Sequence, residues 1–273
     1  ELKMVSKNDY EEGRYLYCIV NGVEETDFGQ TGIENNLVYT VALNDIGAVV
    51  HRCEAKPYKT EDKEKAAEWI LTHQYVIDLA TKKFGTVIPL TFDTIFRGGD
   101  ETVKKWLSQE YRQLKALLVK LEGKAEYGVQ VFLESDFVNK MMEESGEIQR
   151  LEGDLETKTS GAAYLFRKKL EKRTHVEKEA SMNKHAKELY GQIIKLVGDV
   201  RLEPTKREVP EEWRGKQMIL NLVCLSHKDK IQNLGTLLRE VNKREGFAVR
   251  FTGPWPPYSF VEEIRESKTE VSG

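Results

Sequence analysis

The stretch Phe251-Thr252-Gly253-Pro254-Trp255-Pro256-Pro257-Tyr258-Ser259-Phe260-Val261 is the most informative part of this chain. It holds three of the seven prolines together with four aromatic side chains. Each proline fixes φ near about −65°, removes a backbone donor and biases the preceding residue toward an extended conformation. The pattern predicts a stiff apolar strip that continues a strand beginning near Phe247. Such a strip suits either the edge of a core or a recognition surface.

Upstream of this strip, the second half of the chain predicts a ferredoxin-like unit over residues 124–261. After the clearest strand, Ser226-His227-Lys228-Asp229 has the S-x-x-D form of a capping box. The expected order β-α-β-β-α-β is that of the ferredoxin-like motif. Its elements are a strand over 127–133, helices over about 136–151 and 160–197, strands over 200–202 and 218–225, a helix that ends at 246 and a strand from 247.

The first half predicts a separate α/β domain over residues 14–123, so the expected fold class is mixed α+β. Its main helix has apolar positions at helical spacing, namely Ala66, Ile70, His73, Ile77 and Ala80. Asp100 is the expected N-cap of a second helix. The other expected elements are a strand over 14–20, a hairpin of 37–43 and 46–53 around Asn44-Asp45, and a strand over 86–92. Residues 1–13 are expected to form a flexible leader and 262–273 a polar tail.

Composition excludes several classes of function. The chain of 273 residues has 40% hydrophobic and 32% charged residues and a net charge of −3, so no global basic field favours nucleic acid. No apolar run approaches the roughly 20 residues that a membrane span needs. The three cysteines are far apart in sequence and predict neither a disulfide framework nor a zinc site. We therefore expect a cytoplasmic protein with no membrane partner.

Residues with catalytic potential are few. No Walker-type, GxGxxG, GxSxG or HExxH motif is present. His73 is the best candidate for a general base, with Asp78 and His51 as conceivable companions. His73 nevertheless lies on the apolar stripe of its helix, where a hydrogen-bonded packing histidine is the usual case.

Three further features also have ordinary structural explanations. His175 and His185 are ten residues apart on one charged helix, too far for shared metal ligation. Gly98-Gly99-Asp100 could offer helix amides to an anion, although the acidic cap competes for them. The basic run 167–173 is interrupted by Glu171 and is expected to be a solvated helix face that does not bind nucleic acid.

Several motifs together resemble one known family. The C-terminal stretch is similar to the signature of the gas vesicle GvpF/GvpL family. His73-Gln74-Tyr75-Val76 followed by Val87-Ile88-Pro89-Leu90-Thr91-Phe92 resembles the family's H-x-x-V helix and V-x-P-L-x-F strand. Gly161–Leu165 resembles its G-x-A-Y-L helix start, and Met218–Asn221 its M-x-L-N strand. The chain departs from the family where Thr91-Phe92-Asp93 replaces a common R-F-G.

The resemblance implies an N-terminal α/β domain, a ferredoxin-like domain and an accessory role in building gas vesicles in the prokaryotic cytoplasm. The implied partners are the major shell protein GvpA and other accessory proteins, with a minor place on the gas-facing side of the shell. It implies no enzymatic activity, no cofactor and no small-molecule substrate. It leaves open whether the chain is F-like or L-like.

From this we derive a hypothesis for the partner-binding residues. GvpA-type proteins are small and apolar, so a partner must cover hydrophobic surface or strand edges before assembly. A proline-stiffened aromatic strip offers apolar contact while refusing further strand pairing. The residues concerned are Phe251, Gly253, Pro254, Trp255, Pro256, Pro257, Tyr258 and Phe260. Two alternatives stay open: the strip locks the last strand onto its own core, or the protein is a ferredoxin-like small-molecule-binding protein or enzyme with a site between the domains near His73 and Gly98.

Overall fold

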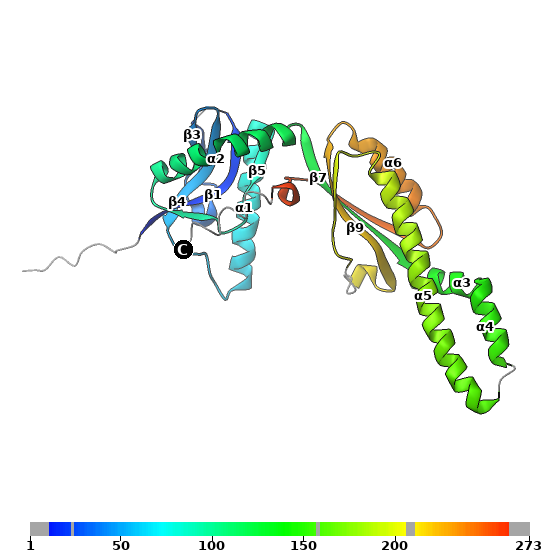
Figure 1. Cartoon of the computed structure of the whole chain (residues 1–273). Coiled ribbons are helices and arrows are strands. Elements are labelled where there is room, and N and C mark those ends of the chain that lie inside the picture. Colours follow the sequence, from blue (N-terminus) through cyan, green and yellow to red (C-terminus); the bar gives the residue numbers. More distant parts are fainter. Residues whose placement is uncertain (1–10, 23–24, 157–158, 206–210, 262–273) are drawn as a thin grey trace, which may run out of the picture. The chain divides into compact units, whose positions relative to one another are not determined.

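A computed structural model describes residues 11–22, 25–156, 159–205 and 211–261. Its fold belongs to the mixed α+β class, as the sequence predicted. The chain forms two compact units, one made of the residues up to Ala125 together with those from Trp255 onward, the other of Glu126–Pro254 (Figure 1). The expected leader lies mostly outside the described residues, although β1 already includes Glu12 and Gly13. The expected tail lies outside them entirely.

The first unit is built on a six-stranded sheet in the order β2-β3-β4-β1-β5, with β6 also paired to β1. Asn44 and Asp45 form the turn of the predicted hairpin, in which Leu43 lies opposite Ile46. The elements are β1 (Glu12–Asn21), β2 (Asp27–Gly29), β3 (Val38–Leu43), β4 (Ile46–Glu54), α1 (Lys63–Phe84), β5 (Val87–Pro89), β6 (Ile95–Arg97) and α2 (Asp100–Leu121).

Two consecutive residues of β1 show that α1 and α2 cover opposite faces of this sheet. The buried guanidinium of Arg14 donates to Asp100 of α2, whereas the Tyr15 hydroxyl bonds to His73 of α1. Successive side chains of a strand point to opposite faces, so the two helices sandwich the sheet. The core beneath α1 contains Tyr15, Tyr17, Trp69, Val76 and Ile77.

Two details of these helices differ from the sequence expectation. Ile70 was placed on the buried stripe of α1 but is 53% exposed, because Trp69 and Val76 take the core positions on that side. Asp100 was expected to be an N-cap. It is instead the first residue of α2, with Gly99 at the N-cap, because its carboxylate accepts bonds from Arg14 and Tyr39.

The second unit contains the four strands of a β-α-β-β-α-β unit in the sheet order β10-β7-β9-β8. Its elements are β7 (Lys124–Glu134), α3 (Ser135–Glu143), α4 (Gly146–Glu156), α5 (Ser160–Ile193), β8 (Asp199–Leu202), β9 (Lys216–His227), α6 (Ile231–Asn242) and β10 (Phe247–Trp255). The expected helix over 136–151 is thus two helices. The expected capping box is absent, because Ser226 and His227 still belong to β9 and α6 begins only at Ile231.

The C-terminal stretch does not stay with the second unit, where it was expected. The chain returns at Trp255 to the first unit, where Tyr258–Phe260 form a short 3-10 helix. Tyr258 packs against the core beneath α1, and Phe260 and Val261 are buried. The first unit is therefore discontinuous in sequence, and its core includes side chains from both ends of the described chain.

Candidate functional site

The C-terminal stretch divides into an exposed part and a buried part. Trp255 is 51% exposed and Pro254 is exposed as well. Pro256, Pro257 and Phe260 are buried. The apolar surface of the buried side chains is thus already used within the chain, which leaves Trp255 as the accessible aromatic side chain of this stretch in the first unit.

Two residues of the stretch support the strand β10 itself. Phe251 stacks on Tyr127 of β7, with ring centroids 5.7 Å apart and an angle of 18° between the rings, and remains 39% exposed. Gly253 has φ 118°, and a Cβ there would lie 2.7 Å from the backbone oxygen of Glu126. The close approach of the two strands requires glycine at this position.

The H-x-x-V and V-x-P-L-x-F motifs of the first unit meet around α1. The Tyr258 hydroxyl donates a 3.0 Å hydrogen bond to Oε1 of Gln74, the second residue of the H-x-x-V motif. Nε2 of His73 lies 3.1 Å from the backbone oxygen of Leu90, in the V-x-P-L-x-F motif. Segments that are far apart in sequence are thereby joined through direct contacts at one helix.

A network of buried tyrosines and histidines lies beneath these contacts. The Tyr15 hydroxyl is 2.8 Å from Nδ1 of His73, and the Tyr17 hydroxyl is 2.7 Å from Nδ1 of His51. Nε2 of His51 is 3.0 Å from the Tyr58 hydroxyl. Both ring nitrogens of each histidine are thus engaged by the protein. The His51 ring also stacks on Tyr15 at a centroid distance of 4.9 Å.

The electrostatics of this network favour packing over proton transfer. Burial lowers the pKa of His51 to about 4. Burial also lowers the pKa of His73 to about 4, although its hydrogen bond to the Leu90 carbonyl acts to raise it. Both imidazoles are therefore neutral at pH 7. Burial likewise raises the pKa of the Tyr15 and Tyr17 hydroxyls. None of these groups is poised near neutral pH, as a general base would be.

The other proposed catalytic companions do not assemble. Asp78 accepts a 3.1 Å bond from the Gln74 side chain on the exposed side of α1. Gly98 donates its amide to the backbone oxygen of Glu12, in the turn that leads into α2. Because α1 and α2 lie on opposite faces of the sheet, His73 and Gly98 have separate surroundings. The structure therefore does not bring together the two residues of the small-molecule alternative.

The anion and metal candidates have partners within the protein. The Asp100 carboxylate binds the Arg14 guanidinium, and a side chain added at Gly99 would meet Arg14 and Glu12. His175 lies 3.5 Å from Glu179, whereas the His185 ring packs edge-on against Phe247. Among the described residues no three His, Cys, Asp or Glu side chains converge on a position that could hold a metal ion.

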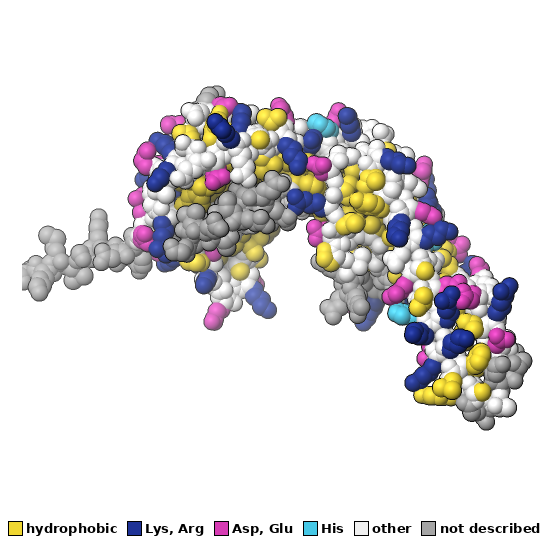
Figure 2. Space-filling view, viewed as in Figure 1, with side chains coloured by type: hydrophobic (Ala, Val, Ile, Leu, Met, Phe, Trp, Pro, Cys, Tyr) yellow, Lys and Arg dark blue, Asp and Glu magenta, His cyan; other side chains and the backbone are white. Residues whose placement is uncertain are grey.

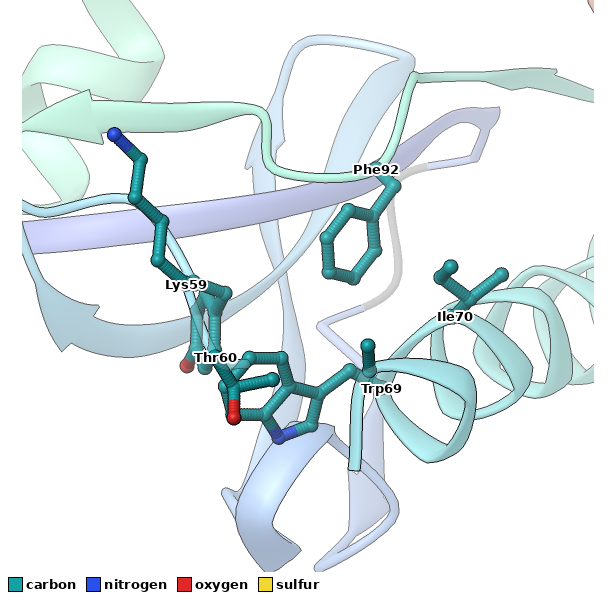
Figure 3. Close-up of a pocket in the computed structure, with 7 residues that line it drawn as sticks. Lys59, Thr60, Trp69, Ile70 and Phe92 are labelled. Carbon is teal, nitrogen blue, oxygen red and sulfur yellow. The ribbon is translucent and has the colours of Figure 1, made fainter. Parts of the chain in front are cut away.

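A pocket of about 400 Å³ opens beside the buried network, at the N-terminal half of α1. The Trp69 and Phe92 rings face the same hollow, with Ile70 at its helix side, whereas the Lys59 chain extends away from it (Figure 3). Tyr58, Thr60 and Ala66 complete the lining. Sequence reasoning missed this pocket, since Trp69 is one residue off the stripe assigned to α1 and Tyr58 lies in a loop.

An exposed apolar strip continues from the pocket along α1. Ile70, Leu71 and Tyr75 are 53%, 69% and 52% exposed. Gln74 lies between them on the helix surface and carries the bond from Tyr258. We call Ile70, Leu71 and Tyr75 the α1 strip. Trp255 belongs to the same unit and precedes Tyr258 by three residues, with at most about 11 Å between their Cα atoms.

In the second unit, a polar chain crosses the sheet. Arg250 donates to Gln130 at 3.4 Å, Gln130 donates to Asn221 at 3.2 Å, and Asn221 donates to the backbone oxygen of Pro204 at 2.9 Å. The asparagine of the M-x-L-N motif thus anchors the loop that follows β8. Its role is to satisfy buried polar groups, which every stable interior requires.

The departure at residues 91–93 also has a structural explanation. Asp93 has φ 67°, the left-handed conformation that glycine adopts without steric cost. Its carboxylate accepts the Tyr58 amide at 2.9 Å, and its own amide donates to the Tyr15 hydroxyl at 3.1 Å. Aspartate tolerates this conformation better than most residues, and these bonds hold it there.

Within the described ranges, none of the helices combines the length and the apolar composition needed to cross a membrane.

Comparisons with known proteins agree with the motifs. The chain is 33% identical to gas vesicle protein L1 of Halobacterium salinarum over 257 residues, which cover 92% of this chain and 91% of the relative. It is 30% identical to gas vesicle protein L of Haloferax mediterranei over 286 residues, 93% of this chain and 88% of the relative.

The fold is similar to that of a solved structure. The crystal structure of the gas vesicle protein GvpF from Anabaena sp. PCC7120 matches with a TM-score of 0.71 at 19% identity, covering 92% of this chain and 98% of that one. The family model described as "Gas vesicle synthesis protein GvpL/GvpF" matches residues 13–262. The chain therefore belongs to the GvpL/GvpF family of gas vesicle synthesis proteins.

Proposed function

We propose that this chain is a non-enzymatic accessory protein that binds the shell protein GvpA, or another gas vesicle protein, during vesicle assembly in the cytoplasm. The observation that supports this most is the α1 strip next to the aromatic-walled pocket. Contiguous exposed apolar side chains are typical of protein interaction sites. The histidines nearby are fully hydrogen-bonded and neutral at pH 7, which supports binding in place of catalysis.

For the C-terminal stretch, we propose fewer partner-binding residues than the sequence suggested. We assign partner contact to Trp255, whose ring is accessible, and not to Phe260, whose ring is already packed. The pocket between Trp69 and Phe92 would accept one large apolar side chain of the partner. Binding hot spots in protein interfaces are enriched in aromatic side chains and cluster in well-packed pockets.

A capture experiment tests this proposal. The full chain is immobilised and challenged with co-expressed GvpA, using wild type, Trp255→Ala and the double variant Leu71→Ser/Tyr75→Ser. We expect capture by wild type and a loss of tenfold or more for the double variant, roughly the effect of removing an apolar anchor. Val119→Ser is the matched control, because Val119 is 62% exposed on α2 of the same unit.

The outcomes test the identity of the partner and the location of the binding surface independently. Equal capture by wild type and by the α1 double variant, with matching melting curves, would reject this surface. Absence of capture by well-folded wild type would reject GvpA as the direct partner, and the same variants would then be tested against other gas vesicle proteins.

A further inference from the structure

The second unit carries a helical hairpin that extends beyond its sheet. α5 has 34 residues, about 51 Å of helix, and only its C-terminal part packs on β9, where Leu189 and Ile193 are buried. Its N-terminal part runs beside α4 (Figure 1). Arg173 of α5 makes two hydrogen bonds to the Glu147 carboxylate, and Glu177 accepts a bond from Ser145. These contacts fix the hairpin and define which side of α5 faces α4.

The solvent-exposed side of α5 is apolar and basic. Tyr164, Leu165 and Val176 are 61%, 69% and 45% exposed. Leu165 and Val176 are eleven residues apart, three helical turns and about 16 Å along one side of the helix. Lys168, Lys169 and Lys172 lie between them and are exposed. We call these six residues the outer face of α5. Figure 2 shows hydrophobic and basic side chains next to one another along this hairpin.

Two of the three lysines of this face lie over aromatic rings of their own helix. The Lys168 ammonium lies 5.2 Å from the centroid of the Tyr164 ring, and that of Lys169 lies 5.6 Å from the Phe166 ring. Cation–π contacts of this kind are attractive at exposed sites. They keep the positive charges against the apolar side chains, so the face offers both kinds of contact at once. Within residues 167–173 the sequence has five basic residues and one acidic residue, in a chain whose net charge is −3.

We infer that the outer face of α5 binds an acidic, amphipathic helix of a partner protein. The apolar residues three turns apart suit a helix that lies along α5 and places its own apolar side chains over Leu165 and Val176. The lysines between them require carboxylates on the flanks of that helix, because charge complementarity selects the partner and its register. This inference is independent of the α1 strip, which lies in the other unit.

Two other classes of anionic partner fit the face less well. Helices that lie in a lipid interface segregate apolar and basic residues to opposite sides, whereas here the two kinds are mixed along one side. Single-stranded nucleic acid needs open aromatic rings for stacking, whereas the Lys168 ammonium already occupies one face of the Tyr164 ring.

The test uses a synthetic helical peptide of about 20 residues, long enough to span both apolar residues. It has leucines along one side and glutamates on its flanks, and a second peptide replaces every glutamate by lysine. Fluorescence anisotropy with the full chain at physiological salt should show binding of the glutamate peptide. We expect binding at least tenfold weaker for the lysine peptide, and for Leu165→Ser with the glutamate peptide.

Charge reversal on the protein provides the matched comparison. Lys168→Glu/Lys172→Glu should weaken binding of the glutamate peptide tenfold or more. Lys184→Glu/Lys187→Glu makes the same charge change at exposed positions of the same helix and should leave binding unaltered. Equal weakening by both double variants, no binding of the glutamate peptide by wild type, or tighter binding of phosphatidylserine vesicles or oligouridylate than of the peptide would each overturn the inference. Helicity measured by circular dichroism should be the same for all variants, since every substituted side chain is exposed.

Discussion

The Tyr258 hydroxyl donates a hydrogen bond to the side chain of Gln74, 184 residues earlier in the chain. This bond joins the C-terminal signature to the H-x-x-V helix, two motifs that the sequence alone gave no reason to place together. It holds the final described turn of the chain against α1, where Tyr258 also packs on the core. The signature is therefore in large part a closing element of the first unit.

Tyr258→Phe should destabilise the protein by about 1 kcal/mol, because it removes one hydrogen bond and leaves the Gln74 oxygen without this donor. Denaturant unfolding of the full chain measures the effect. Tyr75→Phe is the control and should change stability by less than about 0.5 kcal/mol, since Tyr75 is exposed on the same helix. A similar loss in both variants would show that the bond to Gln74 is not the cause.

Phe260→Ala should destabilise by about 3–5 kcal/mol, the usual result of truncating a buried aromatic side chain. Trp255→Ala should cost less than about 1 kcal/mol, because half of its ring surface is in water. Thermal melting of the two variants shows which residue of the motif stabilises the core, Phe260, and which is available for a partner, Trp255. A larger loss for Trp255→Ala than for Phe260→Ala would contradict this division.

Acid should unfold the first unit through its buried histidines. His51 and His73 have a pKa of about 4 in the folded protein and about 6.5 when unfolded. Between these values the unfolded chain binds more protons, so stability falls as pH drops from 6.5 to 4, by roughly 3 kcal/mol for each histidine.

Melting temperatures recorded at pH 7, 5.5 and 4.5 measure this dependence. His73→Gln should be less stable at pH 7 but should lose less on acidification than wild type, because one of the two titrating groups is gone. His175→Gln, at an exposed position, should follow the wild-type curve. An unchanged pH dependence in His73→Gln would show that acid acts elsewhere.

Asp100→Ala should destabilise by about 2 kcal/mol, because it removes the charged acceptor of bonds from Tyr39 and from the buried Arg14 guanidinium. Although burial opposes ionisation, those two donors lower the pKa of Asp100. Urea unfolding is the measurement. Glu101→Ala, at the next residue and 86% exposed, should cost no more than about 0.5 kcal/mol.

Hydrophobic periodicity and turn residues were sufficient to predict the strands and helices that bury one face. The hairpin around Asn44 and Asp45, a short strand over 200–202 and the order of the four strands in the second unit were predicted, although the helix expected over 136–151 is two helices. Sites where a tertiary contact overrides a local pattern could not be predicted in this way. Aspartate is a common N-cap residue, yet the carboxylate of Asp100 accepts a hydrogen bond from the buried Arg14, 86 residues earlier. Ser226 begins a capping-box pattern, yet strand β9 continues through it to His227.

The candidate site shows the same limit. The sequence singled out the aromatic strip but not its division at Trp255, because that division depends on which unit the following residues join. Ile70 fitted the helical stripe of α1 as well as Trp69 did, but Trp69 packs into the core beneath α1 whereas Ile70 is 53% exposed. Long-range contacts decide such cases, and they leave no local periodicity in the sequence.

The discontinuity of the first unit has a consequence for biosynthesis. A ribosome that has made the residues up to Ala125 must translate the roughly 130 residues of the other unit before Phe260 and Val261 exist. At about 5–20 residues per second, the nascent first unit waits for about 6 to 26 seconds with part of its core unsealed. The inserted unit can fold during that delay. A chain terminated within the inserted unit would lack Phe260 and Val261, and its first unit would remain without that part of its core.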